Sequence, residues 1–429
     1  MTVFFGIGLL FVLLAIGAPV GFAMGFSGLF GLIISGHAQV ISGILSTSPI
    51  STVSSFEMIT VPMFLLMAEF VLLSGIADDL FKAAATFLGR LPGGLGMATA
   101  VAGAGFGAIC GTSTASAATL ASTSLPAMIR QGYEPEMASG VVAISGTLSM
   151  LLPTSIALIV FGLLAQVDIG RLLIAGIVPA LLVMITIMAT VFLLAILHPE
   201  RAPAPARVPW KERWILLRRV GPMIALFLTV TGVIYSGLAT PPEASAVGAL
   251  GALVFAAARG RVNRVSLLHA LRRAAHGTCM IAMIIVGAIL FGYFLTLSFV
   301  TQDLVAWVGS LDTSRWVILI LILVGYLILG SFMDQMAILV LTVPIVMPMI
   351  RSLGFDPIWF GILKIVTAEV GMITPPIGLN CYVVARYSGR RPEEVFRGTL
   401  PHFIAHLIAI AILLAVPSLA LWLPSRIGN

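Results

Sequence analysis

The chain has little charge and little cysteine for its length. Of its 429 residues only 9% are Asp, Glu, Lys or Arg, whereas 59% are hydrophobic. Soluble globular domains carry about 25% charged residues, so this composition excludes an ordinary soluble protein. The three cysteines, Cys110, Cys279 and Cys381, are scattered and show no CxxC spacing, so neither a disulfide framework nor a zinc site is predicted.

The motifs of hydrolytic chemistry are missing as well. The sequence contains no HExxH motif, no GxSxG motif and no aspartate pair at a suitable spacing. We therefore predict that the chain is not an enzyme, and we keep an intramembrane hydrolase or lipid transferase as the alternative from another class. His402 and His406 stand four residues apart, but no third ligand accompanies them, so no transition-metal site is predicted.

Long apolar runs are what the chain has in abundance. Stretches near the ~20 residues that cross a bilayer recur from end to end, for example at 172–197, 280–297 and 403–423. The first run, 3–17, lacks a basic segment before it, so we expect an anchor and not a cleaved signal peptide. The net charge of +6 then indicates basic cytoplasmic loops beside anionic lipid and not affinity for nucleic acid.

Two parts of the chain read as copies of one unit. A shift of 222 positions aligns Gly-Tyr-Glu-Pro at 132–135 with Gly-Phe-Asp-Pro at 354–357, without a gap. The same shift aligns Ala115 with Ala337, Pro126 with Pro348, Pro153 with Pro375, Gly176 with Gly398 and Pro179 with Pro401. Most of these identities are Gly or Pro, which set backbone geometry, so a duplicated fold is indicated.

Each copy contains a stretch whose middle does not suit lipid. Residues 111–124 read GTSTASAATLASTS, and eight of these fourteen side chains carry a hydroxyl. We predict re-entrant hairpins with tips near Gly111–Ser113 and Ser331–Asp334. Downstream, Pro153 and Pro375 interrupt the next apolar segment of each copy, and unwound backbone at membrane depth survives only where it lines a cavity.

The loop charges give the two copies an orientation. This arrangement has ten crossings, and with the N-terminus outside it places most of the 23 Lys and Arg residues in the cytoplasm. Five crossings separate Gly132 from Gly354, so the copies are inverted. Inverted repeats with broken helices are typical of secondary transporters with alternating access, which is the predicted functional class.

The predicted organisation follows from these features. We expect N-terminal scaffold helices in 1–56, the first inverted repeat in 57–197, cytoplasmic linkers with arm and scaffold helices in 198–276, and the second inverted repeat in 277–424. The first repeat holds hairpin 1 at about 93–129 and broken helix 137–165, and the second holds hairpin 2 at about 316–350 and broken helix 358–386. The basic stretches 198–219 and 258–276 are expected to lead into amphipathic helices at the interface, as ordinary loops or as arms that brace a scaffold.

Two ion sites are predicted where a hairpin tip meets a helix break. Exposed carbonyls and hydroxyls are hard ligands suited to Na⁺, and the N-termini of half-helices favour a carboxylate. The first site would use the Thr112/Ser113 tip with the break at 149–154, and the second the Gly330/Ser331 tip with the break at 371–377. Small residues that only allow tight helix packing are the alternative explanation.

Several polar side chains are candidate ligands near these sites. Asp334 and Glu369 lie inside apolar stretches and mark an ion path, although Glu369 could instead pair with Lys364. Asn380 could contact substrate through its amide or cap the resumed helix. The predicted substrate-binding set is Ser113, Thr114, Thr154, Ser155, Asp334 and Asn380.

These segments resemble a known family. The run from Gly105 to Ile156, with GTSTASAATLASTS and SMLLPTS, and the later GSFMDQM and GMITPPIGLN look like the paired signatures of the large membrane subunit of tripartite ATP-independent periplasmic (TRAP) transporters. The resemblance covers nearly the whole chain. It implies an all-α polytopic membrane protein of the bacterial inner membrane, with the inverted-repeat elevator fold of the ion-transporter superfamily, two re-entrant hairpins and discontinuous helices.

The resemblance also implies a mechanism and partners. It implies Na⁺-driven uptake of a small organic anion, a carboxylate or sugar acid, which a periplasmic binding protein delivers. A small membrane subunit of four helices would be a separate chain. Sodium coordination is implied for Thr112, Ser113, Ser149 and Leu152 at the first site and for Gly330, Gly371, Thr374 and Ile377 at the second. The alternative within transport is a stand-alone Na⁺/carboxylate symporter of the same superfamily.

The first site departs from the family pattern at three places. The family usually has Gly-Ser-Ser at the first tip, glycine in place of Ser149 and Pro-Pro in place of Pro153-Thr154.

Overall fold

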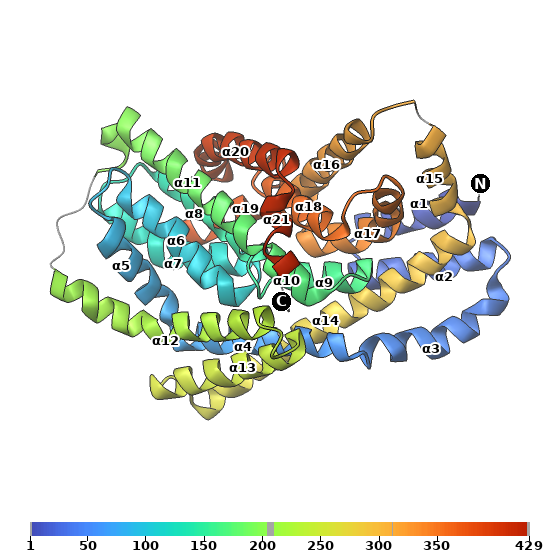
Figure 1. The fold of residues 1–429 in the computed structure, drawn as a ribbon, viewed down its shortest axis with the longest axis horizontal. Helices are drawn as coiled ribbons and strands as arrows, with labels where there is room; N and C mark the ends of the chain where they lie inside the picture. The colour runs from blue at the N-terminus through green and yellow to red at the C-terminus, as the bar shows by residue number, and fades with distance from the viewer. Residues whose placement is uncertain (1, 204–209, 311, 427–429) are drawn as a thin grey trace.

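The computed structural model describes residues 2–203, 210–310 and 312–426. Every regular element in these ranges is a helix (Figure 1), so the prediction of an all-α protein is confirmed. The proline-rich residues 204–209 of the predicted linker lie outside the described residues.

Eight of the described helices are long and apolar enough to cross a membrane. They cover 56–74, 169–197, 213–235, 241–258, 264–297, 315–332, 335–352 and 392–415, and shorter apolar helices lie at 3–15, 20–34, 94–110 and 156–165. The prediction of a multi-pass membrane protein is therefore confirmed.

One bundle gathers the helices that run along the lower part of Figure 1, together with α1, which lies at the right beside the N-terminus. It contains α1 (Thr2–Ala15), α2 (Val20–Ile34), α3 (Ile41–Val53), α4 (Thr60–Ser74), α12 (Trp210–Tyr235), α13 (Pro241–Ala258) and α14 (Arg264–Leu297). Helix α14 packs along α2 and α4, and α13 packs along α4. Glycine allows this contact, because a Cβ added at Gly28 would lie 2.8 Å from the backbone of Leu290.

The second bundle contains the two hairpins and the two broken helices. Its members are α6 (Gly94–Cys110), α7 (Ser113–Arg130), α8 (Pro135–Thr147), α9 (Ile156–Ala165), α10 (Ile169–Ala175), α11 (Ile177–Leu197), α16 (Arg315–Phe332), α17 (Gln335–Ser352), α18 (Pro357–Gly371), α19 (Leu379–Ser388), α20 (Pro392–Ala415) and the short α21 (Ser418–Leu421). Helices α8 and α20 pack closely, since a Cβ added at Gly398 would lie 3.1 Å from the Cα of Gly140.

Two short helices connect the bundles. Helix α5 (Ile76–Leu88) follows α4 and contacts both α6 and α12, and α15 (Val300–Ser310) follows α14 and contacts α17. Asp79 of α5 forms an ion pair with Arg259, directly after α13. The same series of elements, a helix, a connector, a hairpin and a broken helix, therefore occurs twice. It begins once at α4 and again at α14.

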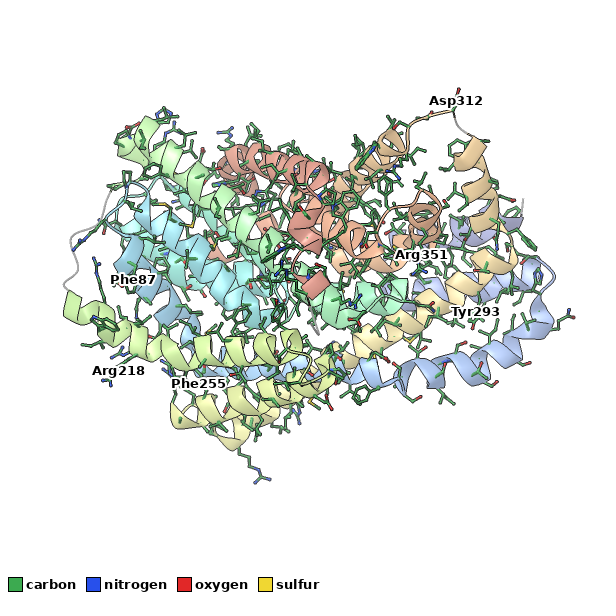
Figure 2. The ribbon with its side chains drawn as sticks, in the orientation of Figure 1. Phe87, Arg218, Phe255, Tyr293, Asp312 and Arg351 are labelled. Carbon is green, nitrogen blue, oxygen red and sulfur yellow. The ribbon has the colours of Figure 1, made fainter. Side chains whose placement is uncertain are left out.

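Charged and aromatic side chains mark the two ends of the molecule. Figure 2 shows Phe87, Arg218 and Phe255 at one end and Asp312 at the other. At the first end Glu69 of α4 pairs with Arg273 of α14 at 2.6 Å, and Arg213 lies over the Phe87 ring at 5.8 Å.

The base of the first hairpin is held by the loop after it. The amide of Leu95 donates to the Tyr133 hydroxyl (3.1 Å), and burial raises the pKa of Tyr133 above its ordinary value. The amide of Glu134 donates to the carbonyl of Arg201 (2.8 Å), and their side chains pair at 3.4 Å. This loop thereby joins the hairpin to the segment after α11.

Two elements differ from the sequence-based expectation. The stretch 258–276 was expected to lead into a separate interface helix before a crossing at 277–297, but α14 runs without interruption from Arg264 to Leu297. A capping box between Asn263 and Ser266 starts this helix early, and no proline interrupts it. Helix α3 was not predicted, because its sequence ISGILSTSPISTV combines hydroxyl residues with an internal proline.

Candidate functional site

The first hairpin turns at Gly111–Thr112, between α6 and α7. Gly111 has φ +68, and a Cβ added there would overlap the carbonyl oxygen of Thr154. Its own carbonyl accepts a hydrogen bond from the amide of Ile156 (3.3 Å), the first residue of α9. The tip therefore rests on the backbone of the first helix break, as the predicted pairing of tip and break requires.

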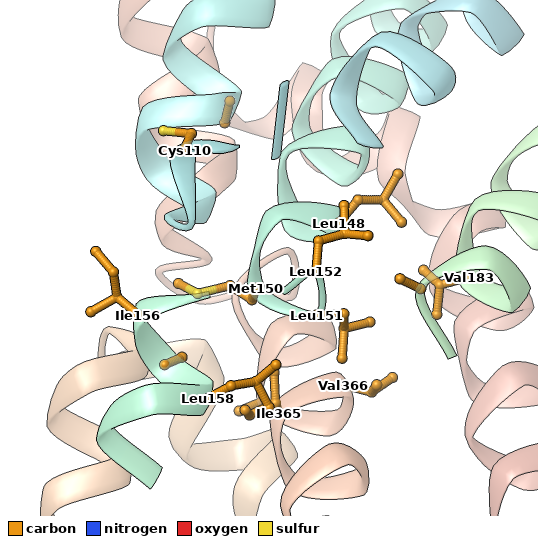
Figure 3. Packing of buried hydrophobic residues seen from close by; sticks show 14 of the residues in the cluster. Cys110, Leu148, Met150, Leu151, Leu152, Ile156, Leu158, Val183, Ile365 and Val366 are labelled. Carbon is orange, nitrogen blue, oxygen red and sulfur yellow. The ribbon is translucent and has the colours of Figure 1, made fainter. Parts of the chain in front are cut away.

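The first break covers residues 148–155. Helix α8 ends at Thr147, a 3-10 turn covers Leu148–Met150, and α9 begins at Ile156. The Ser155 hydroxyl accepts from the amide of Leu158 (3.2 Å) and so caps α9. Figure 3 shows Leu151 and Leu152 in one apolar cluster with Val366 of α18 and Val183 of α11, and the whole break is buried.

The second hairpin turns at Met333–Asp334, between α16 and α17. Asp334 is the N-cap of α17, and its carboxylate accepts from the amide of Met336 (3.1 Å). The carbonyl of Ser331 accepts from the amides of Ile377 (3.1 Å) and Gly378 (3.2 Å). The second tip is thus bonded to the second break in the same way as the first.

The second break covers residues 372–378, between α18 and α19, and includes the cis bond Pro375–Pro376. Gly330 and Gly371 meet where α16 crosses α18, and a Cβ added at Gly330 would lie 2.8 Å from the Cα of Gly371. Unlike the first break, this one reaches the surface at Pro375, Pro376 and Ile377.

The two units contact one another reciprocally. Helix α9, which follows the first break, packs on α17 of the second hairpin, and α19, which follows the second break, packs on α7 of the first hairpin. At this junction the Ser113 hydroxyl lies 4.0 Å from the sulfur of Met372. The predicted sites therefore lie on both sides of one interface between the two repeats.

The residues predicted for sodium occupy these tips and breaks. At the first site Thr112 and Ser113 form the tip, while the Ser149 hydroxyl donates to Ser116 and the Leu152 carbonyl accepts from the amide of Ser155 (2.8 Å). At the second site the Thr374 hydroxyl donates to the carbonyl of Val370 (2.6 Å). Backbone carbonyl and hydroxyl oxygens are thus the available ligands at both sites. A hard monovalent cation such as Na⁺ binds oxygen ligands of this kind.

Several buried side chains at the tips and breaks lack hydrogen-bond partners among the described residues. Thr154 Oγ1, both amide atoms of Asn380 and both amide atoms of Gln335 are buried and unpartnered within the described residues. Thr154 belongs to the first break, Gln335 directly follows the second tip, and Asn380 lies in the first turn of α19 after the second break. Gln335 was missed from the sequence, although its place beside Asp334 at the second tip could have indicated it. Thr114 lies half-buried in the first turn of α7.

The remaining candidates are placed apart from any cluster of ligands. Glu369 and Lys364 do not pair: Lys364 Nζ lies 5.2 Å from the centre of the Tyr326 ring, and the Glu369 oxygens have no hydrogen-bond partner in the described chain. The alternative that Glu369 pairs with Lys364 is therefore wrong, because a separation of five residues places the two side chains on different sides of α18. His402 and His406 are buried, and the described residues contain no group of three metal-ligating side chains.

Comparison with known proteins adds an independent finding. The model of a family described as "Tripartite ATP-independent periplasmic transporter, DctM component" matches residues 7–419. The C4-dicarboxylate TRAP transporter large permease protein DctM of Pseudomonas aeruginosa is 33% identical over 95% of this chain and 94% of its own length. The isethionate TRAP transporter permease protein DctMQ of Oleidesulfovibrio alaskensis is 29% identical over 98% of this chain and 66% of its own length. Among solved structures, the YdaH transporter of Alcanivorax borkumensis has a similar fold, with a TM-score of 0.66, 16% identity and 87% of each chain covered.

Proposed function

Because the chain belongs to the DctM family of tripartite ATP-independent periplasmic transporters and is a large permease protein, not an enzyme, we propose that it moves a small organic anion across the bacterial inner membrane with the energy of a Na⁺ gradient. The observation that carries the proposal is the reciprocal packing of two tips and two breaks. Discontinuous helices that meet at a repeat interface are the usual place for substrate and coupling ions in secondary transporters.

Sodium binds at the two units of tip and break in this proposal. The first site uses Thr112, Ser113, Ser149 and Leu152, and the second uses Gly330, Gly371, Thr374 and Ile377. The support is chemical: the breaks interrupt the regular pattern of helical hydrogen bonds, and backbone carbonyls lie there beside hydroxyl side chains at 112, 113, 149 and 374. Such neutral oxygens replace the hydration shell of Na⁺ without adding a fixed negative charge that would repel the anion.

The substrate anion lies between the two sites in this proposal. Helices α7, α9, α17 and α19 all begin at a tip or a break, and the N-terminus of a helix carries a partial positive charge. Ser113, Thr114, Thr154, Ser155 and Asn380 supply hydrogen bonds there, and we add Gln335. The carboxylate of Asp334 caps α17 and would repel an anion, so its role in this proposal is to hold the second tip. The named relatives transport C4-dicarboxylates and isethionate, which are small anions.

Alternating access follows an elevator movement in this proposal. The hairpin bundle moves as one body, and the bundle of α2, α4, α13 and α14 stays fixed. The connectors α5 and α15 are suited to such a movement, because each contacts both bundles. The partners are a periplasmic binding protein that delivers the anion and a small four-helix membrane subunit. The fused relative supports the second partner, since this chain spans only 66% of it.

Uptake by proteoliposomes tests the proposal. The chain is reconstituted with its small subunit and binding protein. Uptake of a radiolabelled C4-dicarboxylate is then measured as a function of the external Na⁺ concentration. Thr374→Ala should raise the Na⁺ concentration for half-maximal uptake. Thr367→Ala is the matched control, because the Thr367 hydroxyl makes the same kind of bond, to the carbonyl of Leu363 (2.8 Å), inside an unbroken part of α18. Full Na⁺ dependence in Thr374→Ala would remove the second sodium site from the proposal.

A second arm of the experiment separates this proposal from a stand-alone symporter. The purified chain alone is reconstituted and offered free solute. No uptake is expected without the binding protein and the small subunit. Na⁺-driven uptake by the chain alone would overturn the tripartite assembly while leaving the sodium sites in place.

A further inference from the structure

An apolar cavity of about 260 Å³ lies between the connector α5, the hairpin helix α6 and helices α11 and α12. Small side chains on α6 create it. Val101, Ala104, Gly105 and Ala108 recur at i, i+3, i+4 and i+7 and so form one face of that helix. Helix α12 covers this face without filling it, because in this region it packs mainly on α5 and only sparsely on α6.

The cavity opens at an apolar part of the protein surface. Leu181 of α11 and Ile224 of α12 line it and are 47% and 42% exposed. Deeper in the cavity, Leu80 and Leu152 are almost fully buried, and Leu152 belongs to the first helix break. A chain that entered from the bilayer between α11 and α12 would therefore reach the backbone of the first predicted sodium site.

The open end of the cavity is marked by basic and aromatic side chains. Arg219, Met223 and Phe227 recur every four residues and share a face of α12, with Met223 and Phe227 lining the cavity. Arg219 is exposed and stands about 6 Å, one helical turn, before Met223. The exposed Trp214 lies near the same end of α12, and Trp is enriched where a membrane meets water. Figure 2 shows Arg218 at this end of the molecule.

We propose that this cavity binds one acyl chain of an anionic phospholipid, with the lipid phosphate held at Arg219. The walls are apolar side chains, so they suit hydrocarbon. The volume lies just below the ~300–1,000 Å³ of ordinary small-molecule pockets. The positive charge of Arg219 favours an anionic lipid. Arg219 stands one helical turn from the apolar walls, and a similar distance separates a lipid phosphate from the start of its acyl chains.

The position gives the lipid a role in transport. The cavity is bounded by α5 and α12 on one side and by α6 and α11 of the hairpin bundle on the other. A bound chain would fill the boundary across which the proposed movement takes place. This inference does not depend on which anion is carried.

Photocrosslinking tests the proposal. Full-length protein, with and without its small subunit, is delipidated and incubated with phosphatidylglycerol that carries a diazirine on its acyl chain, and crosslinked peptides are mapped by mass spectrometry. Adducts are expected on peptides that contain Met184 or Met223–Phe227, and excess unlabelled phosphatidylglycerol should compete. Ala104→Phe fills the cavity and should abolish these adducts. Ala189→Phe adds the same ring at an exposed position of α11 outside the cavity and should leave them unchanged.

The headgroup is tested separately. Arg219→Gln should weaken competition by phosphatidylglycerol about fivefold, the effect of one basic side chain near an anionic surface, and phosphatidylcholine should compete poorly. Because Arg219 is exposed, Arg219→Gln should keep the fold even if Ala104→Phe does not. The proposal would be overturned if adducts were spread over all lipid-facing helices and were equal in wild type and in Ala104→Phe. Such adducts would show only non-specific contact with the lipids that surround the protein. Loss of the adducts on adding the small subunit would overturn it as well, because that subunit would then cover the cavity.

Discussion

The hydroxyl of Ser113, at the start of α7, lies 4.0 Å from the sulfur of Met372, at the end of α18. These two residues are far apart in the sequence and come from different repeats. Both are buried. The first tip and the second break therefore share one contact, and a change at either should be felt at both predicted sites.

Ser113→Ala should lower uptake of the anion by about tenfold or more, because a hydrogen bond to a charged group contributes roughly 1.5–3 kcal/mol. Initial uptake rates in proteoliposomes measure this at saturating Na⁺. Ser122→Ala is the control, since Ser122 lies on the same helix, is exposed and bonds only to the carbonyl of Thr119. Equal rates for wild type and Ser113→Ala would exclude Ser113 from the substrate site.

Gly111→Ala should destabilise the protein and abolish uptake. Alanine at φ +68 costs about 1–3 kcal/mol, and the added methyl group also overlaps the carbonyl of Thr154. Gly36→Ala separates the two effects, because Gly36 has φ +83 but no neighbour within 4 Å of an added Cβ. Thermal unfolding in detergent should show the larger decrease for Gly111→Ala. Equal decreases would mean that the tip does not rest on the break.

Asn380→Leu should raise stability while it lowers uptake. Both amide atoms of Asn380 are buried without a hydrogen-bond partner in the part of the chain that the structure describes, and removing such a group recovers roughly 1–3 kcal/mol. Asn263→Ala should lower stability and leave uptake unchanged, because loss of the N-cap of α14 costs about 0.5–2 kcal/mol but touches no predicted site. A fall in the melting temperature of Asn380→Leu would show that its amide is satisfied in the folded protein.

Lys364→Met should also stabilise the protein, by about 1 kcal/mol or more, because a buried amino group that has no hydrogen-bond partner among the described residues is replaced by an apolar chain of similar length. The Tyr326 ring at 5.2 Å offsets only part of the cost of burying this group. Lys82→Met, at an exposed position of α5, should change stability by less than about 0.5 kcal/mol. A lower melting temperature for Lys364→Met would contradict the expectation, and differential scanning fluorimetry in detergent is sufficient to see it.

Much of the fold was accessible from the sequence because proline and glycine determine it. Pro153 and Pro375 lie in the two breaks, and Gly111 lies at the first tip, where only a residue without a Cβ fits. The equivalent placement of these residues in the two copies indicated the repeat. Hydropathy alone identified the membrane class.

The contacts between the copies could not be predicted in the same way. Nothing in the local pattern places Ser113 beside Met372. The Glu69–Arg273 pair joins α4 and α14, which are separated in the sequence by the rest of the first repeat and by α12 and α13. The early start of α14 was missed because the basic residues Arg264, Arg272 and Arg273 look like a loop, although their apolar neighbours continue the helix. Gln335 was missed because an isolated amide has no sequence signature until its burial is known.

The uninterrupted length of α14 has a consequence for the depth of the protein in the bilayer. At 1.5 Å per residue its 34 residues span about 51 Å, whereas the hydrocarbon core is about 30 Å thick. The surplus lies at the end that carries Arg264, Arg272 and Arg273. A movement of α14 deeper into the bilayer would place guanidinium groups in hydrocarbon, at a cost of roughly 2.5–3.5 kcal/mol each. The arginines therefore fix the position of α14 along the membrane normal. A thicker or thinner bilayer should change the tilt of this helix and not its position along the normal.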